Sequence, residues 1–150
     1  FTGERSTGWV GSARATLHNV DFSTSALELY RGVLEGIVWS FQRIIDQLIE
    51  MNGPIGRARV GGRVAAEAPG LLTVLADGLS LELVAVKIKR STLLGNARIA
   101  LDVVAPEIPR AEVSTDEALI PDPELVRFYD RRQLQLDALY DQMVASTHTG

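Results

Sequence analysis

The order of apolar and turn-forming residues predicts an α/β fold with neighbouring parallel strands. Stretches with apolar residues every three or four positions alternate with short β-favouring stretches, in the order helix, strand, helix, strand, helix. Glycine or proline follows most of these stretches and marks their ends. The 150 residues are 46% hydrophobic and 23% charged, which suits one globular domain with a buried core.

The first long helix is predicted between Ser25 and Asn52. Ser25 and Glu28 have the spacing of a capping box, in which each side chain accepts a hydrogen bond from the other residue's backbone. Asn52-Gly53-Pro54 should end the helix, since glycine favours left-handed dihedrals and proline cannot continue a helix. An apolar stripe runs along it in steps of three and four: Leu27, Tyr30, Leu34, Ile37, Phe41, Ile44 and Leu48.

Two glycines lie inside this helix, at positions 32 and 36. Each costs about 1 kcal/mol relative to alanine. We therefore expect another backbone to approach closely there, within the domain or from a partner. Glu35 lies four residues after Arg31, a spacing that favours an ion pair on an otherwise solvated face.

The remaining elements are shorter, and residues 1–22 form a glycine-rich loop region. The α/β core (23–105) contains a strand at 57–60, a helix at 69–77 ended by Gly78, a strand at 79–86 and a helix at 92–104. Residues 106–121 form an extended, proline-punctuated connector. A final helix (122–145) begins with Asp122 as cap and Pro123 as first residue. Its docking stripe consists of Leu125, Phe128, Tyr129, Leu136, Leu139, Tyr140 and Met143.

Composition excludes several classes of function. A net charge of −4 argues against a nucleic-acid-binding protein. Without cysteine there are no disulfides or thiolate metal sites, and a cytoplasmic location is expected. No apolar run reaches the length of a membrane span. His18 and His148 are far apart and have no carboxylate at ligand spacing, so no metal site is predicted.

Gly61-Gly62 is the best candidate for a ligand-binding element. It follows a predicted strand and precedes a helix, and glycines in such turns allow phosphate to approach the backbone amides. A tight turn that binds no ligand explains the same residues. When these two glycines are considered alone, the ligand-free turn is the more frequent case. The charged pair Glu4-Arg5 carries no functional weight by itself.

A series of motifs, in order along nearly the whole chain, resembles the FGGY family of carbohydrate kinases. Phe1 to Ser6 (FTGERS) is similar to the family's GER loop, and Ala13-Arg14-Ala15 to the element that follows it. The later motifs are Arg31 to Gly36 (RGVLEG), Gly61-Gly62 at the adenosine loop, Leu75-Ala76-Asp77, Leu94 to Ala100 (LGNARIA), and Tyr129 with Leu139-Tyr140.

The resemblance implies a partial actin-like ATPase (ribonuclease H-like) domain with a C-terminal docking helix. It also implies transfer of the γ-phosphoryl group of Mg²⁺-ATP to a sugar or sugar-acid hydroxyl, nearest to gluconate and xylulose kinases. The family's aspartate base lies upstream, in a catalytic half that this chain lacks. No catalytic residue is therefore expected here, and the isolated chain should be inactive. Gly61, Gly62 and Arg63 are the expected nucleotide-binding residues.

The chain departs from the family pattern at several positions. Arg63 and Val64 replace the third glycine and the alanine of the adenosine loop, and Thr7 stands where the family has proline. A basic cluster precedes the LGNARIA motif: Lys87, Lys89 and Arg90. Arg63 could pair with phosphate, or Arg63 and Glu67 could occlude the pocket.

Three hypotheses therefore stay open: a part of a working sugar kinase, a non-catalytic actin-like interaction module, or an α/β domain that resembles these kinases through packing alone. The sequence also leaves a monomer and a homodimer open.

Overall fold

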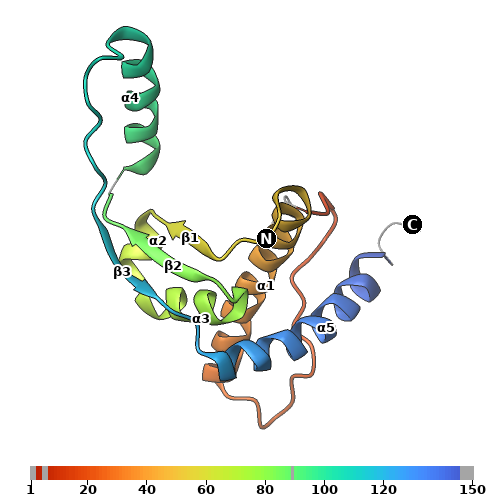
Figure 1. Ribbon diagram of the computed structural model, residues 1–150. Helices are drawn as coiled ribbons and strands as arrows, with labels where there is room; N and C mark the ends of the chain where they lie inside the picture. Colours follow the sequence, from red (N-terminus) through yellow and green to blue (C-terminus); the bar gives the residue numbers. More distant parts are fainter. Residues whose placement is uncertain (1–2, 5–6, 89, 146–150) are drawn as a thin grey trace.

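The computed structural model describes residues 3–4, 7–88 and 90–145, and it confirms the predicted α/β order (Figure 1). The elements are α1 (Ala26–Asn52), β1 (Arg57–Val60), α2 (Arg63–Glu67), α3 (Pro69–Leu79), β2 (Glu82–Val86), α4 (Ser91–Val104), β3 (Thr115–Leu119) and α5 (Pro123–Ala145). None of the helices in these ranges is long and apolar enough to cross a membrane.

Helix α1 begins and ends where the sequence predicts. The Ser25 hydroxyl accepts from the Glu28 backbone N–H, and the Glu28 carboxylate accepts from the Ser25 backbone, which completes the capping box. Gly53 follows the helix with a φ of 84°, a left-handed value that glycine adopts without steric cost.

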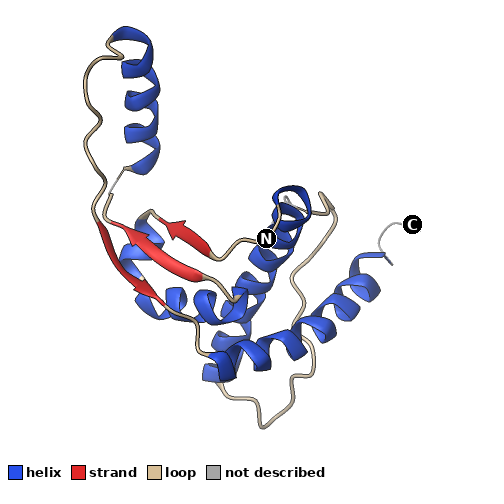
Figure 2. Cartoon of the chain, in the orientation of Figure 1, coloured by secondary structure: helices blue, strands red, loops and turns tan. Residues whose placement is uncertain are grey.

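Three strands form one sheet in the order β1-β2-β3 (Figure 2). Strands β1 and β2 are parallel, as predicted, with Arg57 opposite Glu82 and Val60 opposite Ala85. Strand β3 is antiparallel to β2. The sequence predicted only an extended connector there, because the strand TDEAL lacks the alternating apolar residues that signal a strand. The strand β3 forms because it pairs with β2.

The hydrophobic core lies where α3 packs between the sheet and helix α1. Leu72, Leu75, Ala76 and Leu79 of α3 are buried together with Val38 of α1, and Leu81 and Leu83 complete this cluster from the segment containing β2. Leu83 is 1% exposed. Because α3 also contacts α5 and β3, it is the element that joins the helices to the sheet.

Helix α3 is longer than predicted, and Gly78 lies within it instead of ending it. Ser80 follows the helix in the left-handed conformation (φ 51°), and its backbone N–H donates to Ala76 and Asp77. Gly78 has a packing role, because a Cβ there would overlap the Val38 side chain. The glycine thus allows α1 and α3 to approach closely.

Helix α5 docks through the predicted stripe. The Asp122 side chain accepts from the Glu124 backbone N–H at 2.8 Å and caps the helix. Most stripe residues are half-buried, whereas Leu125 and Met143 at its two ends are exposed. The Asp122 backbone also donates to Asp77 of α3 at 2.9 Å.

The apolar stripe of α1 does not contribute to this core. Val38, the buried residue of α1, lies outside the stripe, and most stripe members are exposed. No described atom lies within 4 Å of a Cβ built at Gly32 or Gly36. The predicted close approach of a backbone is therefore not made by the described residues.

Helix α4 projects away from the other helices (Figure 1) and contains no buried residue. The segment that returns from it to β3 is tied to it by polar contacts. Arg98 donates to the Ala111 carbonyl at 2.5 Å, and Arg110 pairs with Asp102 at 2.6 Å.

Candidate functional site

The glycine turn, residues 61–63, lies at the carboxyl end of the parallel strand β1. Ligands of open α/β sheets bind at this end of the strands. Gly62 has a φ of 99°, which an L side chain rarely adopts, so the turn itself requires glycine. A Cβ at Gly61 would meet Val86 at an ordinary 3.8 Å, and one at Gly62 would meet no described atom within 4 Å. Among the described residues, the turn is open on the side of Gly62 where a side chain would stand.

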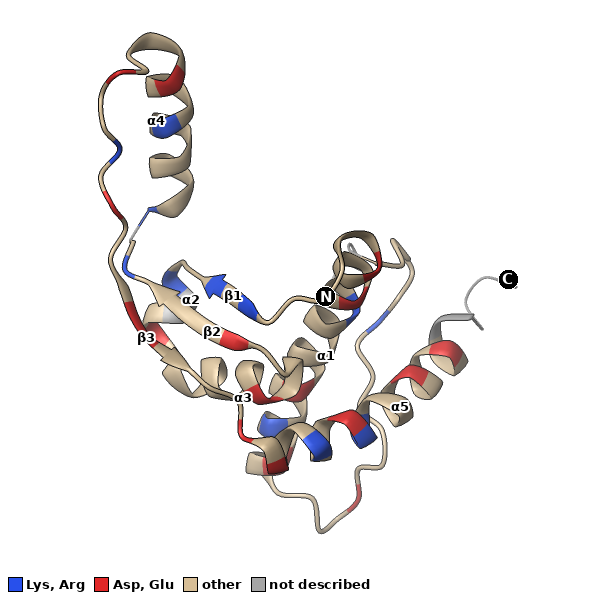
Figure 3. Cartoon of the chain, in the orientation of Figure 1, with Lys and Arg blue, Asp and Glu red and all other residues tan. Residues whose placement is uncertain are grey.

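Arg63 follows the turn and forms an ion pair with Glu67 at 2.8 Å. The two side chains are 84% and 60% exposed, and they lie one helical turn apart on α2. Further positive charge lies close by in the fold, on β1 and at the end of β2, where Lys87 pairs with Asp116 (Figure 3). The site therefore has basic groups beside the turn, but Arg63 already has a carboxylate partner.

A second, denser site surrounds Glu4. Its carboxylate accepts from the Tyr140 hydroxyl at 2.7 Å, from the Arg43 guanidinium at 2.8 Å and from the Thr7 hydroxyl at 3.2 Å. These partners come from α5, α1 and the N-terminal loop. We refer to Glu4, Thr7, Arg43 and Tyr140 as the Glu4 cluster.

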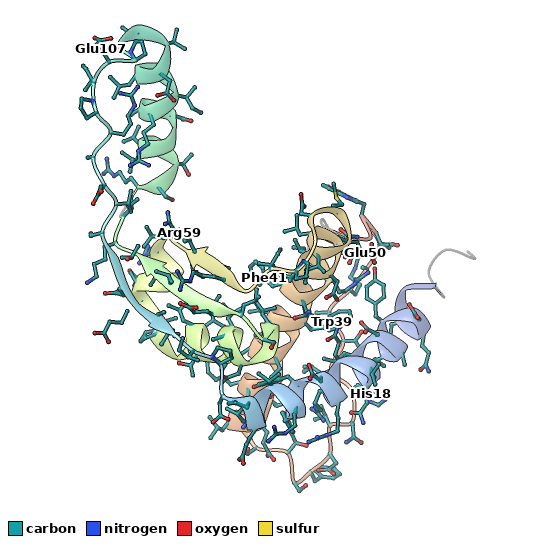
Figure 4. All side chains as sticks on the ribbon, viewed as in Figure 1. His18, Trp39, Phe41, Glu50, Arg59 and Glu107 are labelled. Atoms are coloured by element: carbon teal, nitrogen blue, oxygen red, sulfur yellow. The ribbon has the colours of Figure 1, made fainter. Side chains whose placement is uncertain are left out.

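Aromatic rings complete the Glu4 cluster. The Arg43 guanidinium lies 3.7 Å from the centre of the Tyr140 ring and 5.2 Å from that of Trp39, so it makes cation–π contacts as well as an ion pair. Trp39 points from α1 toward α5 (Figure 4) and donates to Asp137 at 2.9 Å. The Arg43 and Glu4 side chains are 22% and 17% exposed, so solvent screens this pair only in part.

The environment stabilises the Glu4 carboxylate. Partial burial opposes ionisation, but the hydrogen bond from Tyr140, the charge of Arg43 and the bonds from Thr7 and the Gly8 backbone together lower the pKa of Glu4. Burial and the bond to Glu4 raise the pKa of Tyr140. Glu4 is thus an ionised, fully hydrogen-bonded anchor rather than a general base, which needs a pKa near neutrality.

The backbone around Glu4 is shaped to fit this cluster. A Cβ at Gly8 would overlap the Glu4 carboxylate and the Tyr140 hydroxyl. Thr7 has a φ of 69°, which proline cannot adopt because its ring fixes φ near −65°. The proline of the related motif would therefore not fit the loop conformation of this chain.

Sequence reasoning missed the Glu4 cluster because its members are distant along the chain. Glu4 and Arg43 are separated by 39 residues, and Glu4 and Tyr140 by 136. No local spacing could show this. The predicted ion pair between Arg31 and Glu35 is confirmed at 2.8 Å, and Arg132 adds a second contact to Glu35 at 3.8 Å.

Other predicted motif residues take structural positions or fall outside the described residues. Asp77 is 4% exposed and accepts the hydrogen bond from Asp122, so it joins α3 to α5. His18 is exposed. Outside the described ranges lie Phe1, Thr2, Arg5, Ser6, Lys89 and His148.

Known proteins match this chain in sequence and in fold. Residues 1–101 match the FGGY family of carbohydrate kinases, C-terminal domain. A comparison with curated protein sequences gave no match.

The structure resembles solved sugar kinases. Xylulose kinase from Rhodospirillum rubrum is 21% identical with a TM-score of 0.78, and the match covers 91% of this chain and 29% of that one. Ligand-bound xylulose kinase from Lactobacillus acidophilus is 17% identical with a TM-score of 0.80, and the match covers 97% of this chain and 30% of that one. Plasmodium falciparum glycerol kinase with ADP is 20% identical with a TM-score of 0.73, and the match covers 96% of this chain and 29% of that one. The predicted actin-like ATPase fold is confirmed, as part of a domain, and the chain spans under a third of these structures.

Proposed function

Because the chain belongs to the FGGY family of carbohydrate kinases, we propose that it supplies the nucleotide side of an ATP-dependent sugar kinase. The observation that supports this most directly is the open glycine turn at the carboxyl end of β1. Gly62 holds a left-handed backbone there, and no described atom fills the space beside it. A nucleotide could therefore approach the Gly62 backbone from this side without meeting a described side chain.

Gly61, Gly62 and Arg63 are the residues we assign to nucleotide binding. The glycines would lie against the nucleotide, and Arg63 would exchange Glu67 for a phosphate, since the present pair is exposed and therefore weak. Bound Mg²⁺-ATP would supply the γ-phosphoryl group to be transferred. The chain as a whole resembles a solved glycerol kinase with ADP, which is consistent with nucleotide binding by the complete protein.

The base that deprotonates the sugar and the pocket that recognises it belong to a part of the kinase outside this chain. The Glu4 carboxylate accepts hydrogen bonds from three side chains, and its lowered pKa makes it a poor base. We therefore propose that the isolated chain is inactive and that the complete protein, located in the cytoplasm, phosphorylates a ketopentose, a polyol or a sugar acid such as gluconate.

Phosphorylation by the complete protein tests this proposal. ATP-dependent phosphate transfer to one of these substrate classes is expected, together with loss of nucleotide affinity in Gly62→Val, whose side chain would occupy the open side of the turn. Gly70→Ala is the matched control, because no described atom lies within 4 Å of a Cβ there and its φ is not left-handed. Absence of transfer to every class would contradict the kinase proposal.

A second candidate function rests on the Arg63–Glu67 pair. If this pair occludes the turn, the domain acts as a non-catalytic interaction module. Calorimetric titration of the complete protein with ADP separates the two functions, since tight binding excludes the module and supports the kinase.

A further inference from the structure

Two arginines lie on the same face of strand β1, but only one of them has a counter-charge. Arg57 and Arg59 are two residues apart and both are exposed, so the alternation of a strand puts their side chains on one face. Arg57 lies opposite Glu82 and pairs with it at 2.6 Å. Arg59 lies opposite Val84, and no described residue forms an ion pair with it. Within the part of the chain that the structure describes, its charge is therefore not neutralised.

Arg59 also lies beside the glycine turn, on the same face of the sheet. Ala58 and Val60 pack against the core, so Arg59 and Gly61 lie on the opposite face. Figure 4 shows Arg59 near the carboxyl end of β1, on the other side of the sheet from α3. Two residues along a strand span about 6.6 Å, a distance that an arginine side chain can bridge. A Cβ at Gly61 would meet Val86 at 3.8 Å and no nearer described atom, so the guanidinium has room above Gly61.

An arginine without a counter-charge beside an open glycine turn is suited to a phosphate group. The guanidinium is planar, stays charged and can donate two parallel hydrogen bonds to phosphate oxygens. A phosphate above Gly61 would also lie near the Gly62 backbone, where no described atom is within 4 Å of the absent side chain. Resting on the proposed function, we propose that Arg59 is a further nucleotide-binding residue, whose guanidinium binds a phosphate of the nucleotide.

This role separates Arg59 from the arginine in the turn itself. Arg63 has to leave Glu67, with which it pairs at 2.8 Å, before it binds a phosphate. Arg59 has no described carboxylate to leave. Arg59 should therefore contribute more to the affinity for phosphate than Arg63 does.

Calorimetric titration of the complete protein with ADP and with adenosine tests this role. Arg59→Met removes the charge and keeps a long side chain, and it should weaken ADP binding by about tenfold or more. Adenosine has no phosphate, so its affinity should change by less than about twofold. Arg59→Lys keeps the charge and should recover most of the lost affinity for ADP.

Arg57→Met is the matched control. Arg57 lies on the same strand and the same face, but its charge is already paired with Glu82. The affinity for ADP should therefore change by less than about twofold in this variant. Thermal denaturation of both variants checks that each is folded, and the two exposed positions should give similar, small shifts in Tm.

Equal effects of Arg59→Met and Arg57→Met on ADP affinity would overturn the proposal. A loss of adenosine affinity as large as the loss of ADP affinity would overturn it as well, because Arg59 would then not act on the phosphate. A third such result is unchanged ADP affinity with a larger fall in Tm for Arg59→Met than for Arg57→Met, which would make Arg59 an ion-pair partner within the complete protein.

The proposed function can be judged separately from the role of Arg59. Phosphate transfer to a sugar together with any of these three results would leave the kinase function standing and remove only Arg59 from the nucleotide site. A complete protein that binds no ADP would contradict both proposals.

Discussion

The Glu4 cluster and the glycine turn are held in opposite ways. Glu4 is bonded by groups from the N-terminal loop, α1 and α5, and these groups leave 17% of its side chain exposed. Gly61, Gly62 and Arg63 are bounded by one strand and one short helix, and Arg63 is 84% exposed. The first site fixes distant parts of the chain to one another, and the second leaves room for a ligand. Stability should therefore depend on the first site far more than on the second.

The largest effect is expected for Arg43→Ala. It leaves the partly buried Glu4 carboxylate without its counter-charge and removes the cation–π contacts with Trp39 and Tyr140. We expect a loss of about 3 kcal/mol in the free energy of unfolding, measured by urea denaturation. Arg31→Ala, at a side chain that is 58% exposed, should cost clearly less. Similar losses for the two variants would contradict the central role of Arg43.

Gly8→Ala should cost about 2 kcal/mol, in the range for overpacking. The added methyl group would overlap the Glu4 carboxylate and the Tyr140 hydroxyl, so the hydrogen bond between them must lengthen or break. Thermal denaturation measures the loss. Combining Gly8→Ala with Tyr140→Phe gives a further check, because the second change removes the hydroxyl that the methyl group displaces. Strictly additive losses would show that Gly8 acts elsewhere.

Low pH should weaken the Glu4 cluster. Because hydrogen bonds and Arg43 lower the pKa of Glu4 in the folded chain, its contribution is present above the ordinary carboxyl pKa of 4.5 and is lost as the pH falls through the lowered value. Glu4→Gln should therefore lose less stability than the unmodified chain between pH 5 and 3, in denaturation curves measured across this range. Parallel pH profiles for the two proteins would remove Glu4 as the titrating anchor.

The sequence predicted the fold well where the determining interactions are local. The capping box of Ser25 and Glu28 lies within one helical turn, and the parallel pairing of β1 and β2 follows from the intervening helices. Strand β3 and the position of Gly78 within α3 were not predicted, because each depends on a neighbour that is distant in sequence: β2 in one case and Val38 in the other.

The same distinction applies to the sites. Gly61-Gly62 is a local sequence signal and therefore could be identified from the sequence. Nucleotide binding at these glycines is our proposal. The sequence around Glu4 does not indicate its role, because its partners Arg43 and Tyr140 become neighbours only after α1 and α5 pack. A carboxylate in a short motif can thus be structural when its donors come from distant helices.

At the glycine turn, Gly62→Ala should cost about 1 kcal/mol. The cost comes from the left-handed backbone alone, since φ is 99° and no described atom lies near the added Cβ. Gly61→Ala is the control within the same turn: its φ is not left-handed and its Cβ would meet Val86 at 3.8 Å, so a loss below about 0.5 kcal/mol is expected. Equal losses in urea denaturation would mean that the turn is not strained at Gly62.

The smallest effect on stability is expected for Arg63→Ala, below about 0.5 kcal/mol, because its pair with Glu67 is exposed and local. Urea denaturation of this variant beside Arg43→Ala compares two arginine–carboxylate pairs of the same 2.8 Å length that differ in burial. A small loss at Arg63 and a large one at Arg43 would show that burial, and not the length of the ion pair, decides their contributions. If Arg63→Ala proves as costly as Arg43→Ala, the Arg63–Glu67 pair stabilises the fold as the Glu4 cluster does. Arg63 would then not be free to leave Glu67 and bind a phosphate.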